Sequence, residues 1–242
     1  MTGLGFLDPG NPFSFAYGVS YDGTVVVGAS FSAAFLEAFR WQGGTMIGLG
    51  FLDPGNPYSY ASGASGDGTV VVGASYTDAA GHSEAFRWQG GTMTGLGFLD
   101  PGNPGRFSDA RAVSGDGTTV VGASLNTDGH DEAFRWKDGT MTGLGFLDPG
   151  NPFSSAYGVS YDGSTVVGEG RRGGASEAFR WTNATGMKSI ADLLTQGGVD
   201  LTGWQLEAAT GVSANGVTVV GSGLDPSSKA QAWIARVGID GE

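Results

Sequence analysis

The sequence predicts an all-β fold, a five-bladed β-propeller with four antiparallel strands in each blade. Three observations predict it: one unit is written five times, each unit holds short runs of β-branched residues, and an Asp-Gly or Asn-Gly pair joins two of those runs. The pairs begin at residues 22, 67, 116, 162 and 215. Their spacing of roughly 45–53 residues is typical of propeller blades, although repetition at such a period also occurs in solenoids and arrays.

Composition and charge narrow the function classes. The 46 glycines fall at fixed places in the repeat, unlike those of a flexible linker, and the 40% of apolar residues can form a packed core. The formal net charge of −12 disfavours binding to nucleic acid or to anionic membranes. No apolar run approaches the roughly 18 residues of a membrane span, and the lack of cysteine excludes disulfides. We therefore expect neither a nucleic-acid partner nor membrane insertion.

The first two strands of each unit form a predicted hairpin. In the first unit they cover residues 16–20 and 24–28, and Asp22-Gly23 lies between them. An Asp-Gly pair between apolar runs is a strong hairpin signal, because a type I′ turn needs positive φ at both central residues. The aspartates recur along the repeats, but Asn215 replaces the acid in the fifth unit. This replacement favours a structural over a catalytic role for the aspartates.

The third and fourth strands complete each unit. In the first unit the third strand covers 37–41, whose alternation puts its two aromatic residues on one face and Arg40 on the other. We expect the aromatic rings to pack between blades, and Arg40 to pair with a carboxylate of the Asp22 type. The predicted fourth strand covers 46–52.

The chain is predicted to be a single propeller domain over residues 1–242. Its repeat units cover about 8–52, 53–99, 100–147, 148–194, and 195–242 together with 1–7. The fifth unit reaches only its third strand, 231–237, whereas 1–7 has the sequence of a fourth strand. If this N-terminal strand completes the last blade, the ring closes and two exposed sheet edges disappear. A segment at 189–194 has helical spacing and predicts one short helix on the rim.

The repeat is similar to that of a known family. It combines Ala-x-Gly-Val-Ser-x-Asp-Gly-x-x-Val-Val-Gly with Glu-Ala-Phe-Arg-Trp and Gly-x-Met-x-x-Leu-Gly. Over essentially the whole chain this set resembles the HAF repeat of bacterial extracellular proteins. The family signature has His-Ala-Phe, where this chain has Glu37, Glu84, Glu132 and Glu177. The resemblance implies a secreted or surface-exposed repeat protein of no established activity, although the chain shows no signal-peptide pattern.

A search for catalytic and metal-binding patterns finds none. There is no nucleophile motif, phosphate loop or zinc spacing. The two histidines, His82 and His130, lie in the variable loop between the second and third strands. Asp128, His130, Asp131 and Glu132 are close in sequence, but their spacing matches no metal site. We predict no catalytic residue, no metal and no cofactor.

The loops that join consecutive units carry the candidate ligand-binding residues. Each contains Asp-Pro-Gly-Asn, for which a type II turn is predicted, and an aromatic residue follows. A carboxylate, an amide and an aromatic ring suit a sugar site, because polar groups bind hydroxyls and the ring packs on the apolar sugar face. The alternative is that Asp and Asn only form turns and the rings fill gaps between blades. The candidates are Asp8, Asn11 and Phe13; Asp53, Asn56 and Tyr58; Asp100, Asn103 and Phe107; and Asp148, Asn151 and Phe153.

These observations favour a non-enzymatic binding or structural module that is extracellular or on the cell surface. Its repeated loops would bind glycans or a surface protein, with avidity from several weak sites. Two alternatives stay open, a glycan-processing enzyme on a propeller scaffold and a repeat protein with no specific ligand. A glycosidase needs a specific pair of acids, whereas the acids here repeat with the blades, which favours binding.

Overall fold

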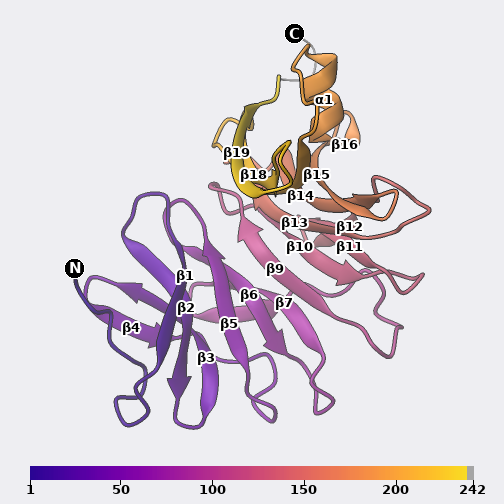
Figure 1. The fold of residues 1–242 in the computed structure, drawn as a ribbon. Helices are drawn as coiled ribbons and strands as arrows, with labels where there is room; N and C mark the ends of the chain where they lie inside the picture. The colour runs from indigo at the N-terminus through magenta and orange to yellow at the C-terminus, as the bar shows by residue number, and fades with distance from the viewer. Residues whose placement is uncertain (239–242) are drawn as a thin grey trace.

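The computed structural model describes residues 1–238 and contains five antiparallel sheets, each built from consecutive strands (Figure 1). The first sheet comprises β1 (Ser14–Val19), β2 (Val25–Ser32), β3 (Phe35–Gln42) and β4 (Thr45–Gly48). The second comprises β5 (Ser59–Ala64), β6 (Val70–Tyr76), β7 (Ser83–Gln89) and β8 (Thr92–Gly95). The third comprises β9 (Ser108–Val113), β10 (Thr119–Leu125), β11 (Asp131–Lys137) and β12 (Thr140–Gly143). The fourth comprises β13 (Ser154–Val159), β14 (Thr165–Arg172), β15 (Ala175–Thr182) and β16 (Gly186–Ser189), and the fifth comprises β17 (Gln205–Val212), β18 (Thr218–Leu224) and β19 (Ala230–Arg236).

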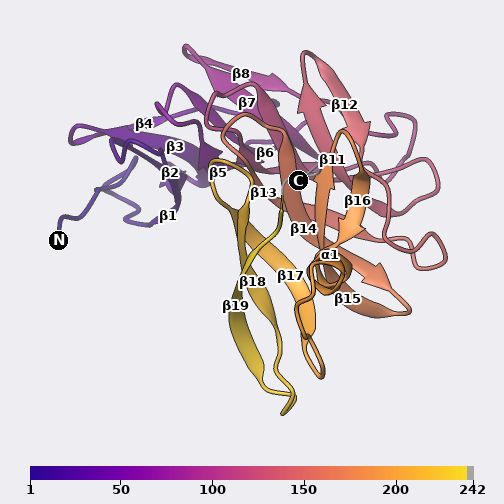
Figure 2. The same ribbon diagram turned by 90° about the horizontal axis from the view of Figure 1, so that it is seen from above.

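The five sheets are arranged about a common axis, with the first strand of each sheet innermost. Figures 1 and 2 show successive sheets following one another around the molecule. One cavity of about 310 Å³ at the axis is lined by first-strand side chains of all five sheets. These include Val19, Ala64, Val113, Val159 and Val212. The prediction of an all-β, propeller-like arrangement with antiparallel strands is therefore confirmed.

Hydrophobic side chains fill the spaces between consecutive sheets. In the first cluster, Val27 and Ala38 from the first sheet pack with Ala61 and Phe86 from the second. Equivalent clusters lie between the other neighbouring sheets. Because both faces of the first sheet's third strand are covered, Ala38 and Phe39 are both buried although they point to opposite faces. The predicted packing of aromatic rings between sheets is thus confirmed for the phenylalanines.

A serine at the start of a first strand links two neighbouring sheets. Ser59 Oγ accepts the Ala38 N–H at 2.9 Å and donates to the Gly50 carbonyl at 2.8 Å. Ser108 and Ser154 make the same pair of bonds one and two sheets later. These hydroxyls satisfy backbone groups that would otherwise be buried without a partner, which is costly.

The predicted hairpins are present, but their turns are not of type I′. Gly23 has a φ of 72°, whereas Asp22 lies outside the positive-φ region, and a type I′ turn needs positive φ at both positions. The Gly23 N–H donates to the Ser20 carbonyl at 2.9 Å. Asp22 Oδ1 accepts the Ser20 hydroxyl at 2.6 Å and the Thr24 N–H at 2.9 Å. The carboxylate therefore closes a longer turn by binding both of its sides.

The Asp-Pro-Gly-Asn loops are not type II turns. Gly55 lies outside the positive-φ region that a type II turn needs at this position. The Asn56 N–H donates to the Asp53 carbonyl at 3.2 Å, and Asp53 Oδ1 accepts the Gly55 N–H at 2.9 Å. The aspartate side chain thus fixes the turn from within, so the glycine does not need a left-handed conformation.

The fourth strand is shorter than predicted, because a glutamate side chain accepts a backbone N–H that would otherwise continue the strand pairing. β4 ends at Gly48 rather than at residue 52. The Gly50 N–H donates to Glu37 Oε1 at 2.9 Å instead of to a neighbouring strand. Glu84 and Glu132 accept the equivalent N–H groups at 2.8 and 2.9 Å in the next two sheets. Glu37, Glu84 and Glu132 thus have a structural role at the end of the fourth strand.

The prediction that Arg40 pairs with a carboxylate of the Asp22 type is wrong. Arg40 Nε donates to the Gly68 carbonyl of the second sheet at 3.0 Å, and its Nη2 donates to Gln42 Oε1 at 2.8 Å. The Asp22 carboxylate is already occupied by the groups of its own turn. The guanidinium therefore links two sheets through a backbone carbonyl rather than through an ion pair.

The prediction that residues 1–7 complete the last sheet is also wrong. No strand lies within 1–7, and β19 is an edge strand in the described part of the chain. The Leu7 N–H donates to Ser30 Oγ at 3.1 Å, and the Ser14 hydroxyl donates to the Gly5 carbonyl at 2.9 Å. These bonds hold the N-terminal segment on the first sheet, and the N-terminus and β19 lie apart in both ribbon views (Figures 1 and 2).

The predicted short helix is confirmed as α1 (Ile190–Gln196). Ser189 caps it, because its hydroxyl accepts the Asp192 N–H at 3.2 Å. In residues 1–238 no helix has the length and apolar character that crossing a membrane requires.

Candidate functional site

The aspartates of the four predicted loop sites bond within their own loops, and the asparagines bond either there or to a neighbouring loop. Asp8, Asp53, Asp100 and Asp148 each accept the N–H of the glycine two residues later, at 2.8 to 3.0 Å. Two asparagines also bond within their loops, Asn103 to the Gly105 N–H and Asn151 to the Asp148 carboxylate. The other two bond to the loop between the second and third strands of the sheet that follows, Asn11 to the Ala33 carbonyl and Asn56 to the Asp78 carbonyl. These hydrogen bonds agree with the alternative that the aspartates and asparagines shape the loops and do not bind a sugar.

The aromatic residues of these loops have different surroundings. The Phe13 ring lies 5.1 Å from the Phe31 ring, and the Tyr58 ring stacks on Tyr76 at 4.5 Å. Phe153 lies under the Arg171 guanidinium at 4.9 Å, and Phe107 is half-buried. The four loops therefore do not present four copies of one aromatic surface.

A cavity of about 460 Å³ lies between the first and second sheets and is lined by Tyr17, Leu36, Tyr58, Tyr60 and Ser62. The Tyr58 and Tyr60 rings meet edge to face, with centroids 6.1 Å apart. Three tyrosines and a serine therefore line one hollow. Of the predicted loop residues, Tyr58 alone lines this cavity, and sequence analysis did not single out Tyr17 for it.

A chain of polar side chains begins at this cavity. The Tyr60 hydroxyl donates to Asp109 Oδ1 at 2.8 Å, from the second sheet to the third. Asp109 Oδ2 lies 3.6 Å from Arg111 Nε, and the Arg111 guanidinium lies 4.9 Å from the centre of the Tyr157 ring in the fourth sheet. The Tyr157 hydroxyl donates to Glu169 Oε2 at 3.0 Å. The chain of contacts thus crosses three sheets.

The residues of this polar chain break the repeat. Asp109 occupies the strand position held by Phe15 in the first sheet, Tyr60 in the second and Ser155 in the fourth. Glu169 occupies a position held by alanine in the first three sheets. The divergence between sheets at these first-strand and second-strand positions was visible in the sequence, and it was the signal that could have located the site.

Burial shifts the ionisation of these groups. Desolvation, with the Asp109 carboxylate nearby, raises the pKa of Tyr60 far above its ordinary value. Desolvation also raises the pKa of Asp109, against the opposing effects of the Tyr60 hydroxyl and Arg111. Burial and the Glu169 carboxylate raise the pKa of Tyr157. At neutral pH the two tyrosines are therefore neutral hydrogen-bond donors.

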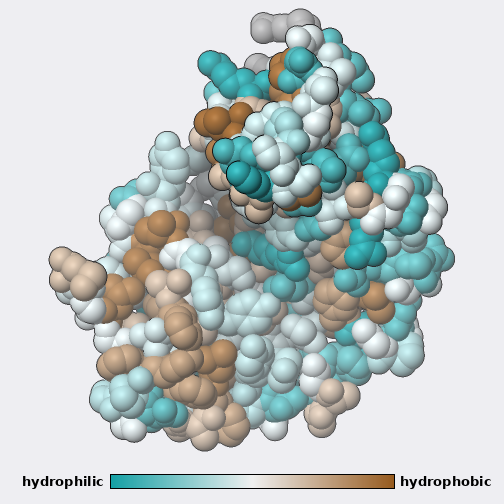
Figure 3. Space-filling model, in the orientation of Figure 1, coloured by the Kyte–Doolittle hydropathy of each residue, from teal (hydrophilic) through white to brown (hydrophobic). Residues whose placement is uncertain are grey.

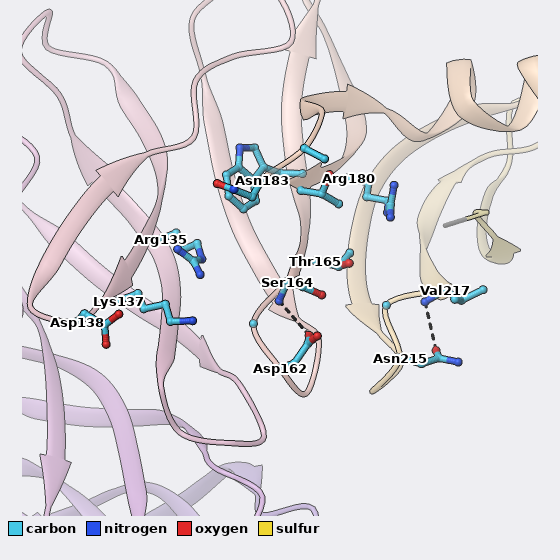
Figure 4. A pocket seen from close by; sticks show the side chains of 15 residues that line it. Arg135, Lys137, Asp138, Asp162, Ser164, Thr165, Arg180, Asn183, Asn215 and Val217 are labelled. Atoms are coloured by element: carbon cyan, nitrogen blue, oxygen red, sulfur yellow. Dashed lines mark hydrogen bonds between the residues drawn. The ribbon is translucent and has the colours of Figure 1, made fainter. Parts of the chain in front are cut away.

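A larger hollow of about 670 Å³ lies at the turn ends of the third, fourth and fifth sheets (Figure 4). It is lined by Arg135, Lys137 and the turn residues Asp162 and Asn215. Asp162 Oδ1 accepts the Ser164 N–H at 3.0 Å, and Asn215 Oδ1 accepts the Val217 N–H at 3.2 Å. Its polar groups belong to the repeated turns, so we regard it as a weaker candidate than the tyrosine-lined cavity.

His82 holds a loop between the second and third sheets. Its Nδ1 lies 2.7 Å from Asp78 Oδ2 and its Nε2 lies 2.8 Å from the Pro104 carbonyl. Arg106 Nη2 lies 3.0 Å from the same Asp78 oxygen. In residues 1–238 no three His, Asp or Glu side chains converge in a way that could hold a metal ion.

Comparison with known proteins gives a fold but no family. No family model matches the sequence, and no curated protein does. The chain is similar to the crystal structure of TolB from Acinetobacter baumannii, with a TM-score of 0.56, 16% identity, and coverage of 93% of this chain and 55% of that one. A putative TolB from Agrobacterium tumefaciens gives 0.58 and 15%, with 93% and 77% covered. A puromycin-hydrolysing peptidase from Mycobacterium tuberculosis gives 0.53 and 14%, with 94% and 37% covered.

These likenesses identify the class of fold. At 14 to 16% identity they show a shared propeller-like architecture and nothing of function. The chain spans about half the length of the first TolB structure.

Proposed function

We propose that this protein is a non-enzymatic binding module whose ligand is a carbohydrate held in the cavity lined by Tyr17, Tyr58 and Tyr60. The observation that carries the proposal is that three tyrosines and Ser62 line one hollow of about 460 Å³. Sites for small ligands combine aromatic walls with a few fixed polar groups. A sugar ring has an apolar face for a phenol ring and hydroxyls for Ser62.

The polar chain behind the cavity supports this choice of ligand. A neutral Tyr60 whose hydroxyl donates to Asp109 keeps its oxygen lone pairs available to a sugar hydroxyl. The Tyr58 ring is fixed by stacking on Tyr76, so little side-chain freedom would be lost on binding. The five sheets are, in this proposal, the blades of a propeller, and the module is extracellular or on the cell surface.

The test is a screen of the wild-type protein on an array of immobilised glycans, followed by calorimetry with the glycan that binds best. Tyr58→Ala is expected to weaken binding at least tenfold, about 1.4 kcal/mol, because the ring that packs on the apolar face of the sugar is removed. Phe153→Ala, at the equivalent loop position of the fourth sheet, is the matched control and is expected to leave the affinity unchanged.

The same measurements distinguish a single tyrosine-lined site from several weak loop sites and from a protein without a carbohydrate ligand. Equal losses in Tyr58→Ala and Phe153→Ala would instead support weak sites in several loops. No bound glycan on the array would contradict the proposal and favour a repeat protein without a carbohydrate ligand.

The competing proposal, a glycan-processing enzyme, has one supporting observation. Asp109 is a partly buried carboxyl beside the cavity with a raised pKa, as general acids often are. Incubation of the best-binding glycan with the protein, followed by analysis of its reducing ends, tests this. Turnover in the wild type that is lost in Asp109→Asn would replace the binding proposal.

A further inference from the structure

The hollow of about 670 Å³ at the turn ends of the third, fourth and fifth sheets gathers positive charge in an acidic protein (Figure 4). Of the 12 lysines and arginines in the chain, Arg135, Lys137 and Arg180 line it, although the formal net charge of the chain is −12. The turn residues of this hollow follow the repeat, but two strand residues of the third sheet beside them do not. These departures distinguish the hollow from the equivalent places between the first three sheets.

The first departure is Lys137, which occupies the position of Gln42 in the first sheet and Gln89 in the second. There the glutamine bonds to the arginine two positions earlier. Gln42 Oε1 accepts a bond from Arg40 Nη2 at 2.8 Å, and Gln89 Oε1 accepts one from Arg87 Nη1 at 2.7 Å. An ammonium group has no lone pair and cannot replace that acceptor. The third sheet therefore has two cations where the first two sheets have a cation and its acceptor.

Arg135, two positions before Lys137, lacks the polar partners of its equivalents. Its Nε is buried without a hydrogen-bond partner in residues 1–238, and its Nη groups form no hydrogen bond or ion pair there. Arg87 Nε is also without a partner, but Arg87 Nη2 donates to the Gly117 carbonyl of the next sheet at 3.4 Å. The Arg135 guanidinium instead lies 5.9 Å from the centre of the Trp181 ring. Its N–H groups are therefore available to an acceptor from outside the chain. The hydropathy of the molecular surface as a whole is drawn in Figure 3.

The second departure is Thr119, which pairs with Lys137 across the strands. It stands where the first two sheets have Val25 and Val70. Thr119 is 0% exposed, and its Oγ1 is buried without a hydrogen-bond partner in the described part of the chain. This oxygen lies against Gly163, which lines the hollow. A valine would fill the same space without the cost of an unpartnered hydroxyl, so the place beneath the cations is polar without a structural need.

The carboxylates near these cations are not paired with them. Asp138 and Asp162 line the hollow. Desolvation raises the pKa of Asp116, and bonds within its own turn together with the Lys137 charge lower it by more. Asp116 and Asp162 each accept bonds from their own turns, and Asp138 is exposed at the rim. In residues 1–238 none of the three forms an ion pair with Arg135 or Lys137.

From these observations we propose that the space between β11 and the turn at 162–165 binds a phosphate or sulfate group of a small ligand. Arg135 and Lys137 are two positions apart on β11 and so lie on the same face of the strand. Figure 4 shows both side chains extending from the third sheet toward that turn of the fourth. Their N–H groups donate to the oxygens of the bound anion, as arginine and lysine do in other phosphate sites.

The number of donors favours an anion with three terminal oxygens over a carboxylate. Besides the two cations of β11, Arg180 and Asn183 line the same hollow, from β15 and the turn after it. The volume of about 670 Å³ exceeds that of a single anion and leaves room for the organic group that carries it. The hollow shares no residue with the tyrosine-lined cavity, so this proposal is independent of the proposed carbohydrate site.

Calorimetric titration with sodium phosphate and with sodium sulfate, at an ionic strength held constant with sodium chloride, tests the proposal. The wild type is expected to bind at least one of the two anions saturably. Lys137→Gln introduces the residue that the first two sheets have at this position, so folding is expected to persist and the affinity to fall at least tenfold. Lys229→Gln removes the same charge at an exposed position outside the hollow and is expected to leave the affinity unchanged. No saturable binding, or equal losses in the two variants, would overturn the proposal.

Thermal unfolding and two further anions complete the test. The bound anion is expected to raise the Tm of the wild type but not that of Lys137→Gln, because a ligand that binds only the folded state stabilises it. Sodium acetate that binds as tightly as phosphate would overturn the choice of an anion with three terminal oxygens. Glycerol phosphate that binds at least as tightly as inorganic phosphate would support a ligand that carries the group, whereas weaker binding of this ester would overturn that part in favour of the free ion.

Discussion

The Tyr60 hydroxyl donates to Asp109 Oδ1 at 2.8 Å across the boundary between the second and third sheets. This bond lowers the pKa of Asp109, while burial raises it by more. The net pKa is therefore above the ordinary value of 3.8. Tyr60→Phe removes the donor, so we expect the pKa of Asp109 to rise further. Carbon-detected NMR titration of the carboxyl group measures this, and an unchanged or lower pKa would mean that the bond does not form.

The same raised pKa predicts how stability depends on pH. The folded protein holds the Asp109 proton to higher pH than the unfolded chain, so this group's contribution to stability is present below pH 3.8 and declines as pH rises through the folded pKa. Asp109→Asn keeps an acceptor for Tyr60 without the charge. As pH rises above about 4, we expect the free energy of unfolding of Asp109→Asn to increase relative to that of the wild type. The increase should be about 1 kcal/mol or less, because the carboxyl keeps some solvent exposure.

Urea denaturation of both proteins between pH 3 and pH 7 measures the difference. Arg111 lies 3.6 Å from the carboxylate, so a variant that becomes less stable as pH rises would mean that this ion pair outweighs the cost of burial. Tyr60→Phe serves as a second comparison, since it keeps the charge and removes the donor.

The serine bridges between sheets give a matched pair of variants. Ser59 is 0% exposed and bonds to both the Ala38 N–H and the Gly50 carbonyl. Ser59→Ala leaves both backbone groups buried without that partner, which is expected to lower the free energy of unfolding by about 1–3 kcal/mol. Ser14→Ala, at the equivalent position of the first sheet, removes one bond in a more exposed place and is expected to cost less.

Thermal and urea unfolding give the comparison between these two serine variants. Equal losses would show that the bridge between sheets adds nothing beyond a local bond.

A close approach of backbone and side chain makes Gly95 sensitive to substitution. A Cβ atom at this position would lie 2.2 Å from Glu84 Oε1, and that oxygen accepts the Gly97 N–H at 2.8 Å. Gly95→Ala must therefore displace the carboxylate and is expected to destabilise the protein by about 1–3 kcal/mol. The double variant Gly95→Ala, Glu84→Ala should lose less than the sum of the single losses, because the clash disappears. Additive losses in urea denaturation would contradict this contact.

The repeat made the sheets predictable from the sequence, because similar runs of β-branched residues favour similar local structures. The hairpins around Asp22 and its equivalents were placed correctly, although their turn type was not. Propensity identifies a strand or a turn, but a carboxylate that binds the Ser20 hydroxyl and the Thr24 N–H selects the turn geometry. The Asp-Gly pair alone does not indicate which hydrogen bonds the aspartate side chain makes.

Contacts between segments that are far apart in the sequence were less predictable. Residues 1–6 repeat 93–98 and so read as a fourth strand, but the bond from the Leu7 N–H to Ser30 Oγ holds the segment on the first sheet. The tyrosine-lined cavity was not predicted, because Tyr17, Tyr60 and Ser62 stand at strand positions where the units differ. Tyr60 and Asp109 stand 49 positions apart at a strand position where the units differ, and only the sheet arrangement brings them together.

The turn aspartates predict a loss of stability in acid. Bonds from the Thr69 N–H, the Thr69 hydroxyl and the Ser65 hydroxyl lower the pKa of Asp67 below its ordinary value of 3.8. Its contribution is therefore present above pH 3.8 and is lost as pH falls through the folded pKa. Asp67→Asn is expected to stay within about 1 °C of the wild-type midpoint at pH 7, since Asn215 makes the equivalent bonds in the fifth sheet, whereas Asp67→Ala should lower it by about 2–4 °C. Thermal unfolding from pH 7 down to pH 2.5 measures both, and the wild type should lose stability relative to Asp67→Asn as the pH falls below 3.8 and the carboxylate takes up its proton. An Asp67→Asn variant that keeps a constant difference from the wild type at both pH values would show that the charge of Asp67 contributes nothing to the turn.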